Sequence, residues 1–123
     1  MHSAPRKEVL AAVANRVDAQ EPFKRVSIDE AKRLIASGIQ IVDVRTLAEY
    51  AAGHLPEARL VPLDSIIARP RDLLKGSNIL FVCAVGQRSA LAAEMAAAIG
   101  LTDLFNLEGG TDAWARAGEP IVR

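Results

Sequence analysis

The stretch that most constrains the fold is a continuous apolar run at residues 79–82, Ile-Leu-Phe-Val, followed by a loop containing Gly86 and an alanine-rich segment. A run this short, rich in β-formers and without alternation, is typical of a strand buried on both faces of a parallel sheet. Beyond the loop, apolar side chains recur every four residues from Leu91 to Ile99, which predicts a helix ending at Gly100. The chain is therefore organised around a buried strand that leads through a short loop into a helix.

The only cysteine, Cys83, stands on this loop, directly after the buried strand. Unsatisfied N–H groups of the loop and the helix N-terminus favour an anion, so we expect a thiolate here and a thiol pKa below the free value of about 8.5. Gly86 is expected to adopt positive φ, and Arg88 adds a positive charge. A lone cysteine is more often a buried core residue, but a core cysteine requires neither Gly86 nor Arg88. The loop therefore indicates a reactive sulfur.

The rest of the chain alternates expected strands and helices. Strands are expected at Val26 and at residues 39–44, 60–61, 79–82 and 104–107. Helices are expected after the capping boxes Ser27-x-x-Glu30 and Thr46-x-x-Glu49, ending at Gly38 and Gly53, and at residues 90–99 and 112–117. Residues 63–68 are expected to form a brief helix or a turn. This alternation predicts an α/β fold, a small parallel sheet of about five strands with helices on both faces. Loops at the carboxyl ends of such strands share one edge, where Asp43 and Cys83 both fall.

Three blocks of the sequence resemble the single-domain rhodaneses, a family of sulfurtransferases. Residues 83–89, Cys-Ala-Val-Gly-Gln-Arg-Ser, resemble the family's C-x-x-G-x-R-S active loop. Residues 43–58 resemble its first signature block, although Leu55 and Glu57 stand where Ile and Gly are commoner. Residues 107–114 resemble its C-terminal block. The resemblance runs from about Val26 to Val122 and implies the rhodanese-like fold.

The resemblance also implies a chemistry and its residues. It places Cys83 as the catalytic nucleophile, which becomes a persulfide when it takes sulfur from a donor such as thiosulfate and then passes it to cyanide or a thiol. It implies no cofactor and no metal. The residues expected to bind the donor are those that follow Cys83 in the loop: Ala84, Val85, Gly86, Gln87, Arg88 and Ser89. Asp43 and Arg45 are expected to support the site.

Two alternatives share the reactive cysteine. Cysteine phosphatases and arsenate reductases use a C-x5-R loop around a tetrahedral oxyanion, whereas Cys83 to Arg88 is C-x4-R, one residue shorter and tighter. The second alternative is a persulfide relay or binding module that serves one protein partner. Its chemistry at Cys83 is the same, so the sequence does not separate it from an enzyme acting on small molecules.

Several other polar or aromatic residues in the resembling blocks can be explained by a structural role as well as by a functional one. Arg45 and Glu49 are four residues apart, which predicts a local ion pair. Asp43 is expected either to accept N–H groups of the cysteine loop or to make a structural hydrogen bond elsewhere. His54 is interpreted as structural, and Trp114 as a core residue.

Length and composition bound the remaining possibilities. At 123 residues we expect an N-terminal extension, residues 1–20 with a short amphipathic helix near 6–17, and one domain, residues 21–123. Zero formal net charge with scattered basic residues argues against nucleic-acid or membrane partners. One cysteine excludes an internal disulfide, and no apolar run approaches the roughly 20 residues of a membrane span, so the protein is expected to be cytoplasmic. The expected partners are a sulfur donor and an acceptor, either small molecules or proteins. The sequence leaves the oligomeric state open.

Overall fold

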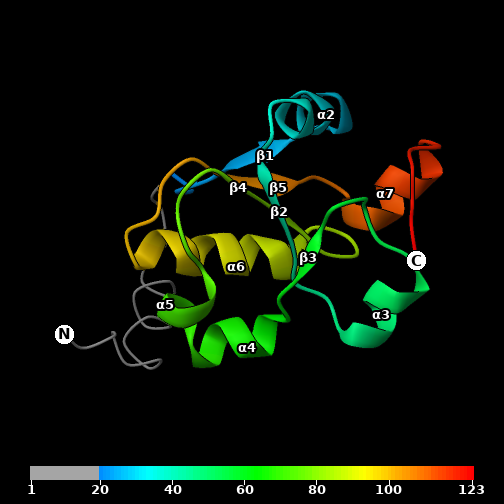
Figure 1. Cartoon of the computed structure of the whole chain (residues 1–123). Helices are drawn as coiled ribbons and strands as arrows, with labels where there is room; N and C mark the ends of the chain where they lie inside the picture. The colour runs from blue at the N-terminus through cyan, green and yellow to red at the C-terminus, as the bar shows by residue number, and fades with distance from the viewer. Residues whose placement is uncertain (1–19) are drawn as a thin grey trace.

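The computed structural model describes residues 20–123, which form a five-stranded sheet and the helices around it. The strands are β1 (Lys24–Val26), β2 (Gln40–Asp43), β3 (Arg59–Leu60), β4 (Ile79–Val82) and β5 (Leu104–Leu107). Every pairing is parallel, in the order β1-β5-β4-β2-β3 (Figure 1), which confirms the predicted sheet. The helix expected over residues 6–17 and most of the expected extension lie outside the described residues.

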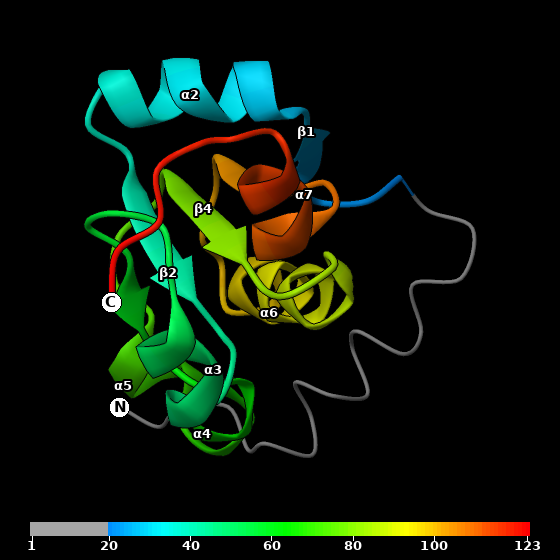
Figure 2. The ribbon, with the colours of Figure 1, turned by 90° about the vertical axis from the view of Figure 1, so that its right-hand side faces the viewer.

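Helices cover both faces of the sheet, as predicted. They are α2 (Ile28–Ala36), α3 (Leu47–Ala52), α4 (Leu63–Ala68), α5 (Pro70–Leu73), α6 (Gln87–Ala98) and α7 (Gly110–Arg116). Figures 1 and 2 show α2 on one side of the sheet and α4 and α6 on the other. Within residues 20–123, none of these helices combines the length and the apolar character needed to cross a bilayer.

The central strand β4 is buried along its whole length, and its residues contribute alternately to the two cores. Phe81 packs in the same cluster as Met95 of α6, whereas Leu80 and Val82 pack in the cluster of Trp114 of α7. Trp114 is 4% exposed, which confirms its predicted place in the core. Because both faces of β4 are covered, the residues that follow it emerge at a fixed point on the sheet edge.

The sequence located the starts of α2 and α3 but placed those of α6 and α7 three and two residues too late, and it missed one helix. Both predicted capping boxes are present, Ser27 with Glu30 and Thr46 with Glu49. No helix was expected between residues 68 and 79, yet Pro70 is the first residue of α5. Proline fits there because the first helical position needs no N–H donor.

Candidate active site

The cysteine loop runs from the end of β4 to the start of α6, and two donors in it point at the sulfur of Cys83. Gly86 adopts φ of +100°, which confirms the predicted positive φ and lets its N–H donate to Cys83 Sγ at 3.1 Å. The hydroxyl of Ser89, in the first turn of α6, lies 3.2 Å from the same sulfur. Cys83 as a whole is 1% exposed, so a substrate must deliver an atom into the loop to reach it.

The pKa of the Cys83 thiol is lowered, as predicted, because two opposing effects do not cancel. Burial disfavours the thiolate and by itself raises the pKa. The Ser89 hydroxyl and the N–H groups of Ser89, Gly86 and Val85 all stabilise the negative sulfur, and together they outweigh burial. The loop therefore favours one negative charge at a site almost closed to water.

The C-terminal part of the chain holds the carbonyl groups of the cysteine loop on the side away from the sulfur. Thr111 N–H donates to Cys83 O at 2.8 Å, and Asp112 N–H donates to Ala84 O at 3.0 Å. Gly110 allows this approach, since a Cβ there would lie 2.5 Å from Ala84 O and closer still to Cys83 O. With the carbonyls occupied by α7, the loop N–H groups are left to face the sulfur. This contact explains why the second glycine of the Leu-Glu-Gly-Gly segment, Gly110, has no side chain.

Asn106 of β5 belongs to the site, although the sequence analysis did not single it out. It is fully buried; its Nδ2 donates to Gly86 O at 3.0 Å, and its Oδ1 lies 2.5 Å from Ser89 Oγ. Ser89 has one hydroxyl proton and two acceptors, Cys83 Sγ and Asn106 Oδ1. The available signal was an amide inside the otherwise apolar strand Leu104–Leu107, because a buried amide needs specific partners.

Arg88 forms a bidentate ion pair with Glu49 of α3. Arg88 Nη1 and Nη2 lie 2.7 and 2.8 Å from the two carboxylate oxygens of Glu49, and both side chains are about one-third exposed. The hydrogen bond from Arg88, followed by that from the Thr46 backbone, lowers the pKa of Glu49 to about 2. The cation predicted beside the sulfur is therefore present, but a carboxylate already binds it.

The predicted ion pair between Arg45 and Glu49 is wrong. Arg45 is buried and binds Asp43 instead, with Nη2 2.8 Å from Oδ2, and it also donates to Gly53 O at 2.7 Å. Arg45 precedes the helix that carries Glu49, so the i,i+4 rule for two residues on one helix does not apply. The Asp43 carboxylate accepts hydrogen bonds from the N, Nε and Nη2 atoms of Arg45. Of the two interpretations of Asp43, the structural hydrogen bond away from the cysteine loop is the one observed.

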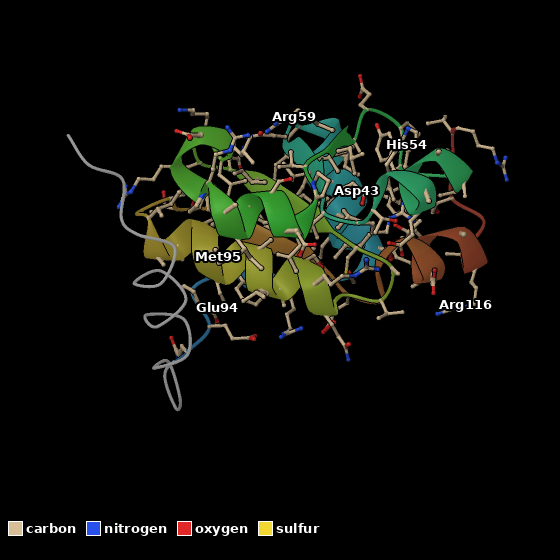
Figure 3. The ribbon with its side chains drawn as sticks, turned by 90° about the horizontal axis from the view of Figure 1, so that it is seen from below. Asp43, His54, Arg59, Glu94, Met95 and Arg116 are labelled. Carbon is tan, nitrogen blue, oxygen red and sulfur yellow. The ribbon has the colours of Figure 1, made fainter. Side chains whose placement is uncertain are left out.

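Of the remaining predicted residues, three lie in the segment after Cys83 and one, His54, lies beside Tyr50 of α3. Ala84 is half-buried, while Val85 and Gln87 are exposed. His54 stacks on the Tyr50 ring, and its Nδ1 lies 2.8 Å from Tyr50 O, in keeping with a structural role. In Figure 3 it lies beside α3, at a distance from the Met95 label on α6.

Fold and site together define a class: a parallel α/β domain whose buried cysteine lies in an anion-stabilising loop between the central strand and a helix. The sequence model of the Rhodanese-like domain family matches residues 27–117. The protein belongs to that family, as the resemblance predicted.

Relatives and solved structures agree with this assignment. A protein of Allochromatium vinosum named sulfurtransferase is 33% identical over 89% of this chain and 96% of its own. A thiosulfate sulfurtransferase GlpE of Pseudomonas entomophila is 33% identical over 75% of this chain and 84% of its own. A rhodanese-like domain protein of Staphylococcus aureus superposes with a TM-score of 0.63 at 40% identity, covering 74% of this chain and 90% of that structure.

Proposed function

We propose that this protein is a sulfurtransferase that moves a sulfane sulfur from a donor to a thiophilic acceptor through a persulfide on Cys83. The observation that carries the proposal is the convergence of the Gly86 N–H and the Ser89 hydroxyl on Cys83 Sγ, at 3.1 and 3.2 Å. The sulfurtransferase names of the relatives support it.

The first half-reaction loads the cysteine. The Cys83 thiolate attacks the outer sulfur of the donor, so a new S–S bond forms as the donor's own bond to that sulfur breaks. The bonding electron pair leaves with the rest of the donor, which is sulfite when the donor is thiosulfate. The negative charge then lies on the outer sulfur of the persulfide, within reach of the N–H groups of the loop residues 84–89.

The second half-reaction removes the sulfur from the Cys83 persulfide. A nucleophilic acceptor, cyanide or a thiol, attacks the outer sulfur of the persulfide and releases the Cys83 thiolate. Loading and unloading share one covalent intermediate, so ping-pong kinetics are expected. No cofactor enters either step.

The test is intact-mass analysis after incubation with thiosulfate. The expected result is a gain of one sulfur atom that is removed by cyanide and is absent from a Cys83→Ser variant. Persulfide loading with negligible small-molecule turnover would identify the relay alternative, in which a protein partner supplies or takes the sulfur. If no sulfur is gained from thiosulfate or from a low-molecular-weight persulfide, the proposal is wrong. It is equally wrong if p-nitrophenyl phosphate is turned over and Cys83→Ser abolishes that turnover.

A further inference from the structure

A cleft lined in part by Arg88 contains two arginines but little unmatched positive charge. Arg88 and Arg45 line the same cleft, together with Asp64. Arg45 is bound to Asp43, and Arg88 is bound through both terminal nitrogens to Glu49. Among the described residues of this cleft, each cation thus has its own carboxylate, and Asp64 adds a further negative charge.

This charge balance matters because Arg88 is the only cationic side chain among residues 83–89. The pKa of Arg88 is raised, first by its hydrogen bond to Glu49 and further by the negative charges of Glu49 and Cys83. A dianionic donor such as thiosulfate gains from a free cation at the pocket and loses from a nearby carboxylate. To bind Arg88 in the observed geometry, such a donor has to displace Glu49 or share the guanidinium with it.

Two exposed hydrophobic side chains lie on the segments that the ion pair connects. Leu47, two residues before Glu49 on α3, is 68% exposed, and Val85 in the loop is 53% exposed. They are two of the three large hydrophobic side chains that are exposed among residues 20–123. The Arg88–Glu49 pair joins the segments that carry them, α3 and the cysteine loop.

We infer that Glu49 is a specificity-determining residue, which disfavours small dianionic sulfur donors and favours sulfur carried on a thiol. This inference rests on the proposed function and names its donor class. A thiol-bound persulfide, R–S–SH, carries less negative charge than thiosulfate and presents an organic group to Leu47 and Val85. The Cys83 thiolate attacks its outer sulfur, the R–S bond to that sulfur breaks, and R–S⁻ leaves with the electron pair.

The chain contains a matched control for Glu49. Glu49 and Glu30 each occupy the third position of a capping box, and each accepts the N-cap backbone N–H, from Thr46 and Ser27 respectively, at 3.1 Å. Only Glu49 also binds Arg88. Glutamine keeps the oxygen that the capping box needs, so Glu49→Gln and Glu30→Gln make the same local change while only the first releases Arg88.

The first measurement is the thiosulfate saturation curve. For Glu49→Gln we expect the thiosulfate KM to fall by roughly tenfold at low ionic strength, and by less at physiological salt because screening weakens the attraction. For a cysteine persulfide donor, kcat/KM should change by less than about twofold. Glu30→Gln should match the wild type with both donors. In the double variant Glu49→Gln with Arg88→Gln, the gain should vanish.

The second measurement does not depend on sulfur transfer. Iodoacetate and iodoacetamide alkylate the same thiolate but differ by one negative charge, so the ratio of their rates reports the potential at Cys83. Glu49→Gln should raise the iodoacetate-to-iodoacetamide ratio several-fold, and Glu30→Gln should leave it unchanged.

These two measurements separate the two ideas. If the ratio and the thiosulfate KM of Glu49→Gln equal those of the wild type, or if Glu30→Gln changes them equally, the role of Glu49 is refuted. The other outcome is that the wild type takes up no sulfur from any donor while the rate ratio still responds to Glu49→Gln. The proposed function then fails, but the neutralisation of the Arg88 charge by Glu49 is confirmed.

Discussion

The replacement Gly110→Ala places a methyl group directly against the backbone of the cysteine loop. Gly110 adopts φ of +60°, and its Cβ would lie 2.5 Å from Ala84 O and closer still to Cys83 O. A carbon normally stays about 3.3 Å or more from a carbonyl oxygen, so the loop has to retreat by about 1 Å. After this shift the N–H groups of the loop no longer point at the sulfur, and the 3.1 Å hydrogen bond from Gly86 N–H to Cys83 Sγ is disturbed.

The size of the effect divides into two parts. A non-glycine residue in the left-handed region costs about 1–2 kcal/mol of stability wherever it occurs. A misplacement of about 1 Å between reacting groups can cost about 100-fold in rate. We therefore expect Gly110→Ala to lose stability and to load sulfur on Cys83 about 100-fold more slowly than the wild type.

A second glycine provides the control for backbone strain. Gly118 has φ of +77°, and a Cβ there meets no heavy atom within 4 Å. Gly118→Ala should lose about 1–2 kcal/mol of stability without a comparable loss of rate. The assays are thermal unfolding, single-turnover persulfide loading followed by intact mass, and the iodoacetamide rate of Cys83 against pH. If folded Gly110→Ala loads sulfur as fast as Gly118→Ala, α7 does not orient the loop and our reasoning fails.

Three further predictions concern the cysteine loop itself. Ser89→Ala removes a hydrogen bond that favours the thiolate, so the pKa of Cys83 should rise and the midpoint of its alkylation against pH should move up by about one unit; an unchanged midpoint would contradict this. Gly86→Val forces a β-branched residue to φ of +100°, so persulfide loading should fall far more than the unfolding temperature does. A folded variant that keeps full loading would contradict this. Val85→Lys adds an exposed cation and should lower the thiosulfate KM roughly tenfold at low salt, the equivalent of about 1.4 kcal/mol; a wild type that already saturates at micromolar thiosulfate would rule this out.

The strands nearest the cysteine could be predicted because their sequences allow little else. Residues 79–82 and 104–107 were expected as strands, and β4 and β5 have those bounds. A four-residue apolar run between turn signals is too short for a helix and too apolar for a surface loop. The third strand was expected one residue later than β3 (Arg59–Leu60), since two residues carry almost no periodic signal.

The ion pairs of the site could not be predicted from local spacing. Glu49 and Arg88 are 39 residues apart, and only the crossover between β2 and β4 brings their helices together. Arg45 was expected to bind Glu49 because four residues separate them, but its side chain turns back to Asp43 at the end of the strand. Sequence patterns describe one element at a time, whereas these partners are chosen by how the elements meet.

The groups that hold the cysteine loop come later in the chain than Cys83 itself, so a ribosome synthesises them after it. Asn106 holds Gly86 O and contacts Ser89, and the N–H groups of residues 111 and 112 hold the loop carbonyls. The first strand, β1, cannot pair in the sheet until β5 has been synthesised, because β5 is its sheet partner.

While those residues are still missing, the nascent chain contains β4 and its cysteine but not the contacts that shape the loop. We expect its thiol to keep the pKa of a free cysteine, about 8.5, and to be mostly protonated at neutral pH. On this reasoning, the order of the strands in the sheet keeps the thiol protonated until β5 and α7 have been synthesised and packed.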